Sequence, residues 1–170
     1  MLNMNFCDFV KGNIGAVYEE YHFTGWIYRS SSSIVRWAMH KRSKVSRIVK
    51  IIPRNISTEK KAMKEINVLK KMDNPSIIKI YEYFVDNEFI YLIFEPIDGK
   101  HIYNPIVGVE EYILRNLQRI LKQILIGIDH FHMRGIAHCN LIPENILVTK
   151  VDNEIYIKII GFGSAINIEN

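Results

Sequence analysis

The spacing of apolar residues in the first third of the chain predicts strands that follow a patternless opening. Residues 1–25 show no clear period and are predicted to form an irregular arm with at most one short strand. A polar turn at residues 28–33 precedes two apolar, β-branched runs at residues 34–39 and 46–52. Such runs, bounded by a turn and by a proline, are typical of β-strands.

An amphipathic helix is predicted to follow these strands. Ser57 is expected to cap a helix that ends near Met72, because a serine side chain can accept a hydrogen bond from the first helical turn. Ala62, Ile66 and Leu69 fall on one face of this helix and are expected to face the core. An Asp-Asn-Pro sequence then ends it.

The remaining apolar runs predict a hairpin, a loop, one long helix and a second hairpin. The expected elements are strands at 77–85 and 89–94, a loop at 96–108, a helix at 110–133, and strands at 146–148 and 155–160. The loop is the predicted boundary between two lobes. This order of elements predicts an α+β fold.

Composition excludes several classes of protein without assigning a function. The chain has 170 residues, of which 48% are hydrophobic and 24% are charged, as expected for one globular domain. A net charge of +4 without a basic, aromatic stripe gives no reason to expect nucleic acid as a partner. The sequence offers no membrane-length apolar run and no signal-peptide pattern, so we expect no membrane partner and a location in the cytoplasm or the nucleus.

Two segments in the last third carry the most specific motifs. From Ile136 the chain reads Ile-Ala-His-Cys-Asn-Leu-Ile-Pro-Glu-Asn-Ile-Leu-Val, and from Ile157 it reads Ile-Lys-Ile-Ile-Gly-Phe-Gly-Ser-Ala. They resemble the His-Arg-Asp-Leu-x-Pro-Glu-Asn catalytic loop and the Asp-Phe-Gly loop of eukaryotic protein kinases. Upstream, Lys50 in Arg-Ile-Val-Lys and Glu65 on the next helix match the ion pair of that family in order and spacing.

The resemblance is to serine/threonine kinases, and among them most to the calcium-dependent protein kinases. It implies a kinase-like α+β fold with a complete small amino-terminal lobe and only the first part of the helical carboxy-terminal lobe. The implied divisions are an arm at 1–22, an amino-terminal lobe at about 23–94, a hinge at 95–98 and a partial carboxy-terminal lobe at 99–170.

The resemblance also implies that the catalytic positions are degenerate. Asn140 stands where the family has its catalytic aspartate, and a neutral amide cannot act as a general base. Gly161 replaces the aspartate that holds magnesium, and glycine has no side chain to supply an oxygen ligand. Asn145 matches the second metal ligand of the family. An equal alternative is a structural asparagine whose side chain hydrogen-bonds to the loop backbone. Ile142 replaces a lysine near the transferred phosphate. We therefore expect no bound metal.

The implied ATP pocket is altered in the same way. The three glycines of the phosphate loop correspond to Tyr28, Ser30 and Ser33, so an ordinary polar turn is the favoured interpretation. Ile48 and Phe94 add bulk where the adenine ring would lie. No cofactor is expected. If the chain is a working kinase, its cofactors would be ATP and magnesium. The pocket positions implied by the resemblance are Ile27, Val35, Lys50, Glu95, Ile97 and Leu147.

Other matching positions are expected to serve packing. His138 is expected to be a buried, hydrogen-bonded structural residue, not a metal ligand or a base. A Cys139–His138 nucleophile is rejected, because adjacent side chains diverge in direction. The four positions implied to stack between the lobes are Leu69, Ile80, His138 and Phe162.

The predicted function is that of a truncated pseudokinase that binds or regulates a protein partner, with an active kinase as one candidate partner. The alternatives are a serine/threonine kinase, or a fragment of one, and a non-functional fragment of a decayed or misassembled gene. In the family, a further helix covers part of helix 110–133. We therefore expect an exposed apolar face there, at Leu114, Leu121 or Leu125, as a candidate interface.

Overall fold

A computed structural model of the chain describes residues 11–14, 16–102, 109–152 and 154–168. The chain divides into two compact units, which are described separately. Unit 1 comprises Met1–Lys71 and Lys79–Pro96, and unit 2 comprises Met72–Ile78 and Ile97–Asn170.

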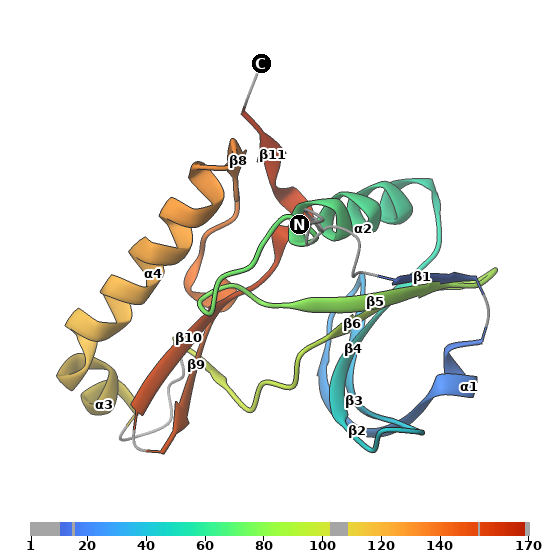
Figure 1. The fold of residues 1–170 in the computed structure, drawn as a ribbon, viewed down its shortest axis with the longest axis horizontal. Coiled ribbons are helices and arrows are strands. Elements are labelled where there is room, and N and C mark those ends of the chain that lie inside the picture. Colours follow the sequence, from blue (N-terminus) through green and yellow to red (C-terminus); the bar gives the residue numbers. More distant parts are fainter. Residues whose placement is uncertain (1–10, 15, 103–108, 153, 169–170) are drawn as a thin grey trace, which may run out of the picture. The chain divides into compact units, whose positions relative to one another are not determined.

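Unit 1 is a six-stranded sheet with one long helix (Figure 1). The strand order is β1-β5-β6-β4-β3-β2, in which β1 and β5 run parallel and the other neighbours run antiparallel. The elements are β1 (Lys11–Ile14), α1 (Val17–Glu20), β2 (Tyr21–Arg29), β3 (Ile34–His40), β4 (Ser46–Pro53), α2 (Ile56–Leu69), β5 (Ile80–Val85) and β6 (Phe89–Phe94).

The predicted irregular arm is wrong for most of its described length. Residues 11–14 form β1, residues 17–20 form α1, and β2 already begins at Tyr21. Val17 and Tyr21 are 1% and 3% exposed and belong to an apolar cluster on one face of the sheet. A four-residue strand followed by a single helical turn is too short to show a period, which is why the pattern was missed. Residues 1–10 lie outside the described part.

Helix α2 is where the sequence placed it, but its cap is different. The side-chain oxygen of Asn55 accepts hydrogen bonds from the backbone amides of Ser57 and Thr58, each at 3.0 Å. The Thr58 hydroxyl in turn accepts from the Asn55 amide at 3.0 Å, which completes a capping box. Ser57 is therefore not the cap. The residues predicted to face the core are buried: Ala62, Ile66 and Leu69.

The predicted antiparallel pair of strands is confirmed as the β5–β6 hairpin, and Asp86 organises its turn. One Asp86 carboxylate oxygen accepts hydrogen bonds from the amides of Glu88 (2.8 Å) and Phe89 (2.7 Å), and the other accepts the hydroxyl of Tyr91 at 2.9 Å. Burial disfavours the charged form of Asp86, but these hydrogen bonds and nearby Arg54 outweigh it and lower the pKa of the carboxyl.

A lowered carboxyl pKa makes the stability of unit 1 dependent on pH. Since the folded state holds Asp86 ionised, its contribution is present above the pKa of the unfolded chain, about 3.9, and is lost as pH falls through the lower folded value. We expect Asp86→Asn to flatten the acid limb of a plot of unfolding free energy against pH. Urea titrations between pH 2 and about 6 measure this. An acid limb that the substitution leaves unchanged would show that other carboxyls cause the loss of stability at low pH.

Unit 2 contains two consecutive helices and two small sheets, of order β10-β9-β7 and β11-β8. Its elements are β7 (Lys100–His101), α3 (Val109–Arg115), α4 (Leu117–His132), β8 (Ile136–Ala137), the 3-10 helix Pro143–Asn145, β9 (Ile146–Val151), β10 (Glu154–Ile159), the 3-10 helix Phe162–Ser164 and β11 (Ile166–Asn167). With unit 1, these elements confirm the predicted α+β class. Over the residues described, no helix is both long and apolar enough to cross a membrane.

The single helix predicted over residues 110–133 is interrupted. Asn116 separates α3 from α4, with a φ of −109° and a ψ of 9° that are not helical. Its amide closes the last turn of α3 on the carbonyl of Ile113 (3.1 Å), and its carbonyl accepts from Ile120 in the first turn of α4 (3.0 Å). Asparagine favours such boundaries, because its short polar side chain competes for backbone groups. The apolar stripe continues across this break, so it did not reveal it.

Helix α4 holds β10 in place. The side-chain amide of Gln123 donates to the carbonyl of Ile155 (2.9 Å), and its oxygen accepts from the amide of Ile157 (3.1 Å). These are the bonds a neighbouring strand would make, so Gln123 satisfies the open edge of β10. Gly127 permits the close approach, since a Cβ there would lie 2.8 Å from Ile159. This packing positions the chain that leads into residues 160–164.

Candidate functional site

The expected ion pair between strand and helix is present in unit 1. Lys50 lies on β4, and its Nζ donates to a carboxylate oxygen of Glu65 on α2 at 2.7 Å. The side chains are 26% and 5% exposed, so a nearly buried carboxylate is neutralised by a partly buried ammonium. A buried charge is tolerated only with such a partner, and the pair therefore ties α2 to the sheet.

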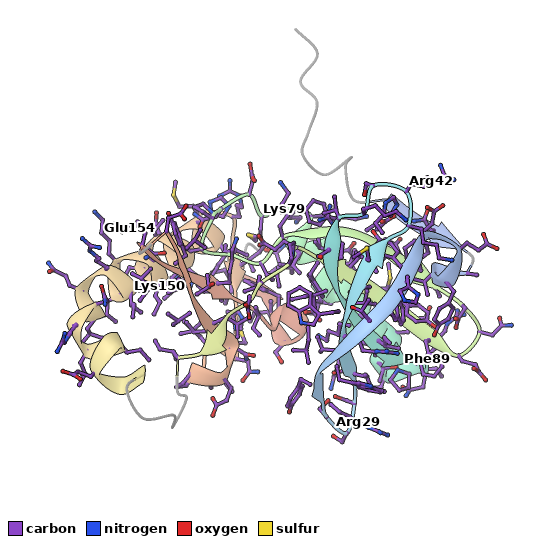
Figure 2. The ribbon with its side chains drawn as sticks, turned by 90° about the horizontal axis from the view of Figure 1, so that it is seen from below. Arg29, Arg42, Lys79, Phe89, Lys150 and Glu154 are labelled. Atoms are coloured by element: carbon purple, nitrogen blue, oxygen red, sulfur yellow. The ribbon has the colours of Figure 1, made fainter. Side chains whose placement is uncertain are left out.

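The turn between β2 and β3, beside Arg29 (Figure 2), satisfies its own backbone. The hydroxyl of Ser30 accepts hydrogen bonds from the amides of Ser32 (3.2 Å) and Ser33 (3.0 Å). The Ser30 amide donates to the Ser33 carbonyl at 2.9 Å. Amides of this kind would cradle a phosphate in a glycine loop. Here a serine oxygen uses them, as expected of a polar turn. The run of four serines was the signal for this turn, but the hydrogen bonds from the turn amides to the Ser30 hydroxyl were not predicted.

The two bulky pocket residues are neighbours on the sheet of unit 1. Ile48 on β4 pairs with Phe94 on β6, and they are 7% and 4% exposed. The following residue, Glu95, is tied to Lys79 twice. Its amide donates to the Lys79 carbonyl at 3.0 Å, and its carboxylate accepts from the Lys79 amide at 2.8 Å. Two apolar side chains thus lie beside a fixed segment at the predicted start of the hinge.

The remaining pocket positions are divided between the two units. In unit 1, Ile27 is 43% exposed on β2 and Val35 is partly buried on β3. In unit 2, Ile97 is buried and Leu147 is partly buried. These two flank Gly99, where a Cβ would lie 3.1 Å from the Ile97 side chain and 3.4 Å from that of Leu147. Their role in binding ATP stays a prediction.

The catalytic-loop histidine is a packed structural residue, as predicted. The Nδ1 atom of His138 accepts from the amide of Asn140 (3.2 Å), so the proton is assigned to Nε2, which lies 2.9 Å from the carbonyl of Ile160. The ring is 3% exposed and lies 4.5 Å from the ring of Phe162. With both nitrogens occupied, His138 ligates no metal. Phe131 completes this aromatic cluster, 5.9 Å from Phe162.

Asn145 joins the catalytic-loop position to the Gly-Phe-Gly turn. Its side-chain amide donates to the carbonyl of Asn140 at 2.8 Å. Its backbone amide donates to Ile142 and its carbonyl accepts from Ile160, both at 2.9 Å. Gly161 has a left-handed φ of +82°, and a Cβ built on it would lie only 2.6 Å from the Asn145 side-chain oxygen. The side-chain amide of Asn145 thus satisfies loop backbone, and its role as a metal ligand stays a prediction.

These residues do not fit a magnesium ion. Magnesium demands several oxygen ligands in near-octahedral geometry, but this position offers one amide side chain and a glycine. The Asn145 side chain also fills the space that a side chain at 161 would need. Nowhere in the described ranges do three His, Cys, Asp or Glu side chains gather as metal ligands.

Comparison with known proteins identifies the family. Residues 21–170 match the protein kinase domain. Calcium-dependent protein kinase 4 of Plasmodium berghei is 36% identical over 114 residues, covering 66% of this chain and 22% of that protein. Calcium-dependent protein kinase 5 of Plasmodium falciparum is 36% identical over 129 residues, covering 75% and 23%. A Dictyostelium discoideum protein described as a probable myosin light chain kinase is 30% identical over 144 residues, covering 85% and 46%.

The chain thus spans less than half of each of these relatives. The match agrees with the architecture, in which a strand-rich unit precedes the first helices and the small sheets of a helical lobe. The kinase-like fold expected from the motifs is confirmed. The chain belongs to the eukaryotic protein kinase family.

Proposed function

We propose that this chain is a kinase-like protein that does not transfer phosphoryl groups and acts by binding a protein partner. The observation that carries the proposal is the position of the Asn145 side chain, which lies against Gly161 where the family binds metal. Phosphoryl transfer depends on metal ions that neutralise charge on the transferred phosphate. A single amide beside a glycine cannot supply that site.

Two further features of the described residues support the proposal. Asn140 offers a neutral amide at the base position, where its backbone carbonyl is engaged by Asn145 at 2.8 Å. The turn amides of Ser32 and Ser33 are taken by the Ser30 hydroxyl. Base, metal ligand and phosphate loop are therefore altered together, and one compensating change would not restore catalysis.

One observation favours the second candidate, a serine/threonine kinase or a fragment of one. The ion pair of Lys50 and Glu65 is formed at 2.7 Å, as the binding of ATP phosphates in this family requires. Under that candidate ATP and magnesium would be cofactors. We weigh the pair as structural, because Glu65 is buried and needs a cation whether or not a nucleotide is present.

Under the proposal, the outward face of α3 and α4 is the candidate surface for the partner. Leu114, Leu121 and Leu125 are 68%, 48% and 63% exposed there. An active kinase is one candidate partner, and the proposed location is the cytoplasm or the nucleus. The open groove on this face is lined by Gln118, Leu121, Lys122, Leu125, Ile126 and Asp129.

A thermal-shift titration with ATP, with and without magnesium, tests the proposal. A ligand at a hundred times its Kd stabilises the folded state by about 2.7 kcal/mol, which raises the Tm by several degrees. We expect no shift at millimolar ATP. Magnesium chloride alone and ATP alone are the controls for ionic effects. A Tm that rises with ATP only when magnesium is present would favour the enzyme instead.

A further inference from the structure

Strand β1 lies outside the family domain and extends its sheet. The kinase match begins at residue 21, whereas β1 comprises Lys11–Ile14. It pairs in parallel with β5, with Gly12 opposite Tyr83 and Asn13 opposite Phe84. Figure 1 shows β1 along the outer edge of β5. Without β1, the backbone groups of that edge would be unpaired.

Two side-chain contacts fit β1 to this edge. Gly12 crosses the ring of Tyr83 so closely that a Cβ would lie 2.5 Å from the hydroxyl and 2.7 Å from Cζ. A larger residue would have to push the ring aside. The side-chain amide of Asn13 donates to one carboxylate oxygen of Glu82 at 2.9 Å, and the hydroxyl of Tyr21 donates to the other at 2.5 Å. The edge thus selects a small residue followed by a hydrogen-bond donor.

The chain after β1 then crosses one face of the sheet. It leaves the edge at β5 and reaches β2, the strand at the opposite edge. On the way Val17 is buried in the apolar cluster, and the ring of Tyr18 lies 5.0 Å from that of Phe23 and 6.2 Å from that of Tyr91. Lys41 donates to the Tyr18 carbonyl at 2.6 Å. Residues 11–14 and 16–20 together form a strap that pairs with the β5 edge and covers part of this face.

We propose that the β5 edge is a strand-addition site, which the strap occupies in cis. Once the strap is released, the site accepts a peptide of the same pattern, whose first residues add to the sheet as a strand. The occupant has a glycine opposite Tyr83, a donor for Glu82 at the next position, and an apolar side chain four residues later, as at Val17. Added strands gain affinity from backbone hydrogen bonds and specificity from alternate side chains.

The wild-type chain keeps the site closed because the strap is covalently attached. A tethered segment acts at a millimolar effective concentration, so it outcompetes a peptide added at micromolar concentration. The site involves neither the metal position nor the base position. The proposal therefore stands or falls independently of the proposed function.

The test uses a fluorescent peptide of residues 10–21 and a release variant of the whole chain that carries Gly12→Val and Asn13→Asp. The valine meets Tyr83, and the new aspartate repels Glu82. We expect saturable peptide binding to the release variant by fluorescence anisotropy, and none to the wild type. A peptide with the same two substitutions should not bind. Gly25→Ala is the matched control, since a Cβ there meets Trp37 at an ordinary 3.4 Å.

Absence of binding to a folded release variant would overturn the proposal, as would equal binding to the wild type. A wild-type dimer that the two substitutions abolish would support the site, with a second copy as the donor. Hydrogen exchange of the wild type tests release even if the variant does not fold. Amides of β1 should exchange faster than those of β3 and β4, through local opening. Equal exchange rates would mean that the strap opens only on global unfolding.

Discussion

Lys50→Met is expected to lower the free energy of unfolding of unit 1 by about 3–5 kcal/mol, in the absence of any nucleotide. The substitution keeps the apolar stem but removes the cation that neutralises Glu65, whose side chain is only 5% exposed. An unpaired charge at such a site costs more than the pair itself contributes. Urea denaturation followed by tryptophan fluorescence measures this in the right unit, because Trp26 and Trp37 both belong to unit 1.

Two comparisons make this prediction specific. Adding Glu65→Leu to Lys50→Met should restore much of the loss, because the uncompensated carboxylate is then gone. Arg42→Met removes an exposed pair with Glu20 in the same unit, whose side chains are 84% and 38% exposed, and should cost about 0–1 kcal/mol. If Lys50→Met cost no more than Arg42→Met, the buried pair would contribute no more to stability than an exposed one.

The parts of the site that the sequence predicted are those set by local spacing. The positions of Lys50 and Glu65 on consecutive elements were enough to predict their ion pair. The motif around His138 was enough to predict a packed histidine, because the motif fixes which neighbours it meets. In both cases the family pattern sets the geometry, so the identity of the side chains at those positions was enough for the prediction.

The features that the sequence did not predict depend on contacts between distant residues or on single backbone angles. Asn13 meets Glu82 across 69 positions, and nothing in the local pattern of residues 11–14 indicates a parallel strand. The break at Asn116 rests on one non-helical residue inside an unbroken apolar stripe. The contact between Asn145 and Gly161 arises from two residues whose identities were known but whose separation was not.

The retained and the altered positions therefore follow a physical division. Lys50, Glu65, His138 and Phe162 hold elements together whether or not a nucleotide binds, and they keep the residues of the family. Asn140 and Gly161 stand where the family needs ionised oxygen for catalysis, and neither supplies it. The proposed binding role needs only the first set of residues, so stability is the quantity by which that set can be tested.

Phe162→Ala is expected to destabilise unit 2 by about 3–5 kcal/mol. The ring of Phe162 is fully buried, with its centroid 4.5 Å from that of His138 and 5.9 Å from that of Phe131. Truncation leaves a cavity between two rings that are themselves fixed, and it removes two aromatic contacts. Since unit 2 has no tryptophan, the loss is measured by far-UV circular dichroism in urea together with hydrogen exchange of α4.

Ile166→Ala is the matched control for this variant, because it truncates an apolar side chain of the same unit that is 44% exposed. It should change the free energy of unfolding by no more than about 0.5 kcal/mol. Faster exchange in α4 should accompany the Phe162 variant alone, since Phe131 on that helix loses its neighbour. A Phe162→Ala chain as stable as the Ile166→Ala chain would show that the ring leaves the core in solution. The second position of the Gly-Phe-Gly turn would then be a moving part instead of a fixed one.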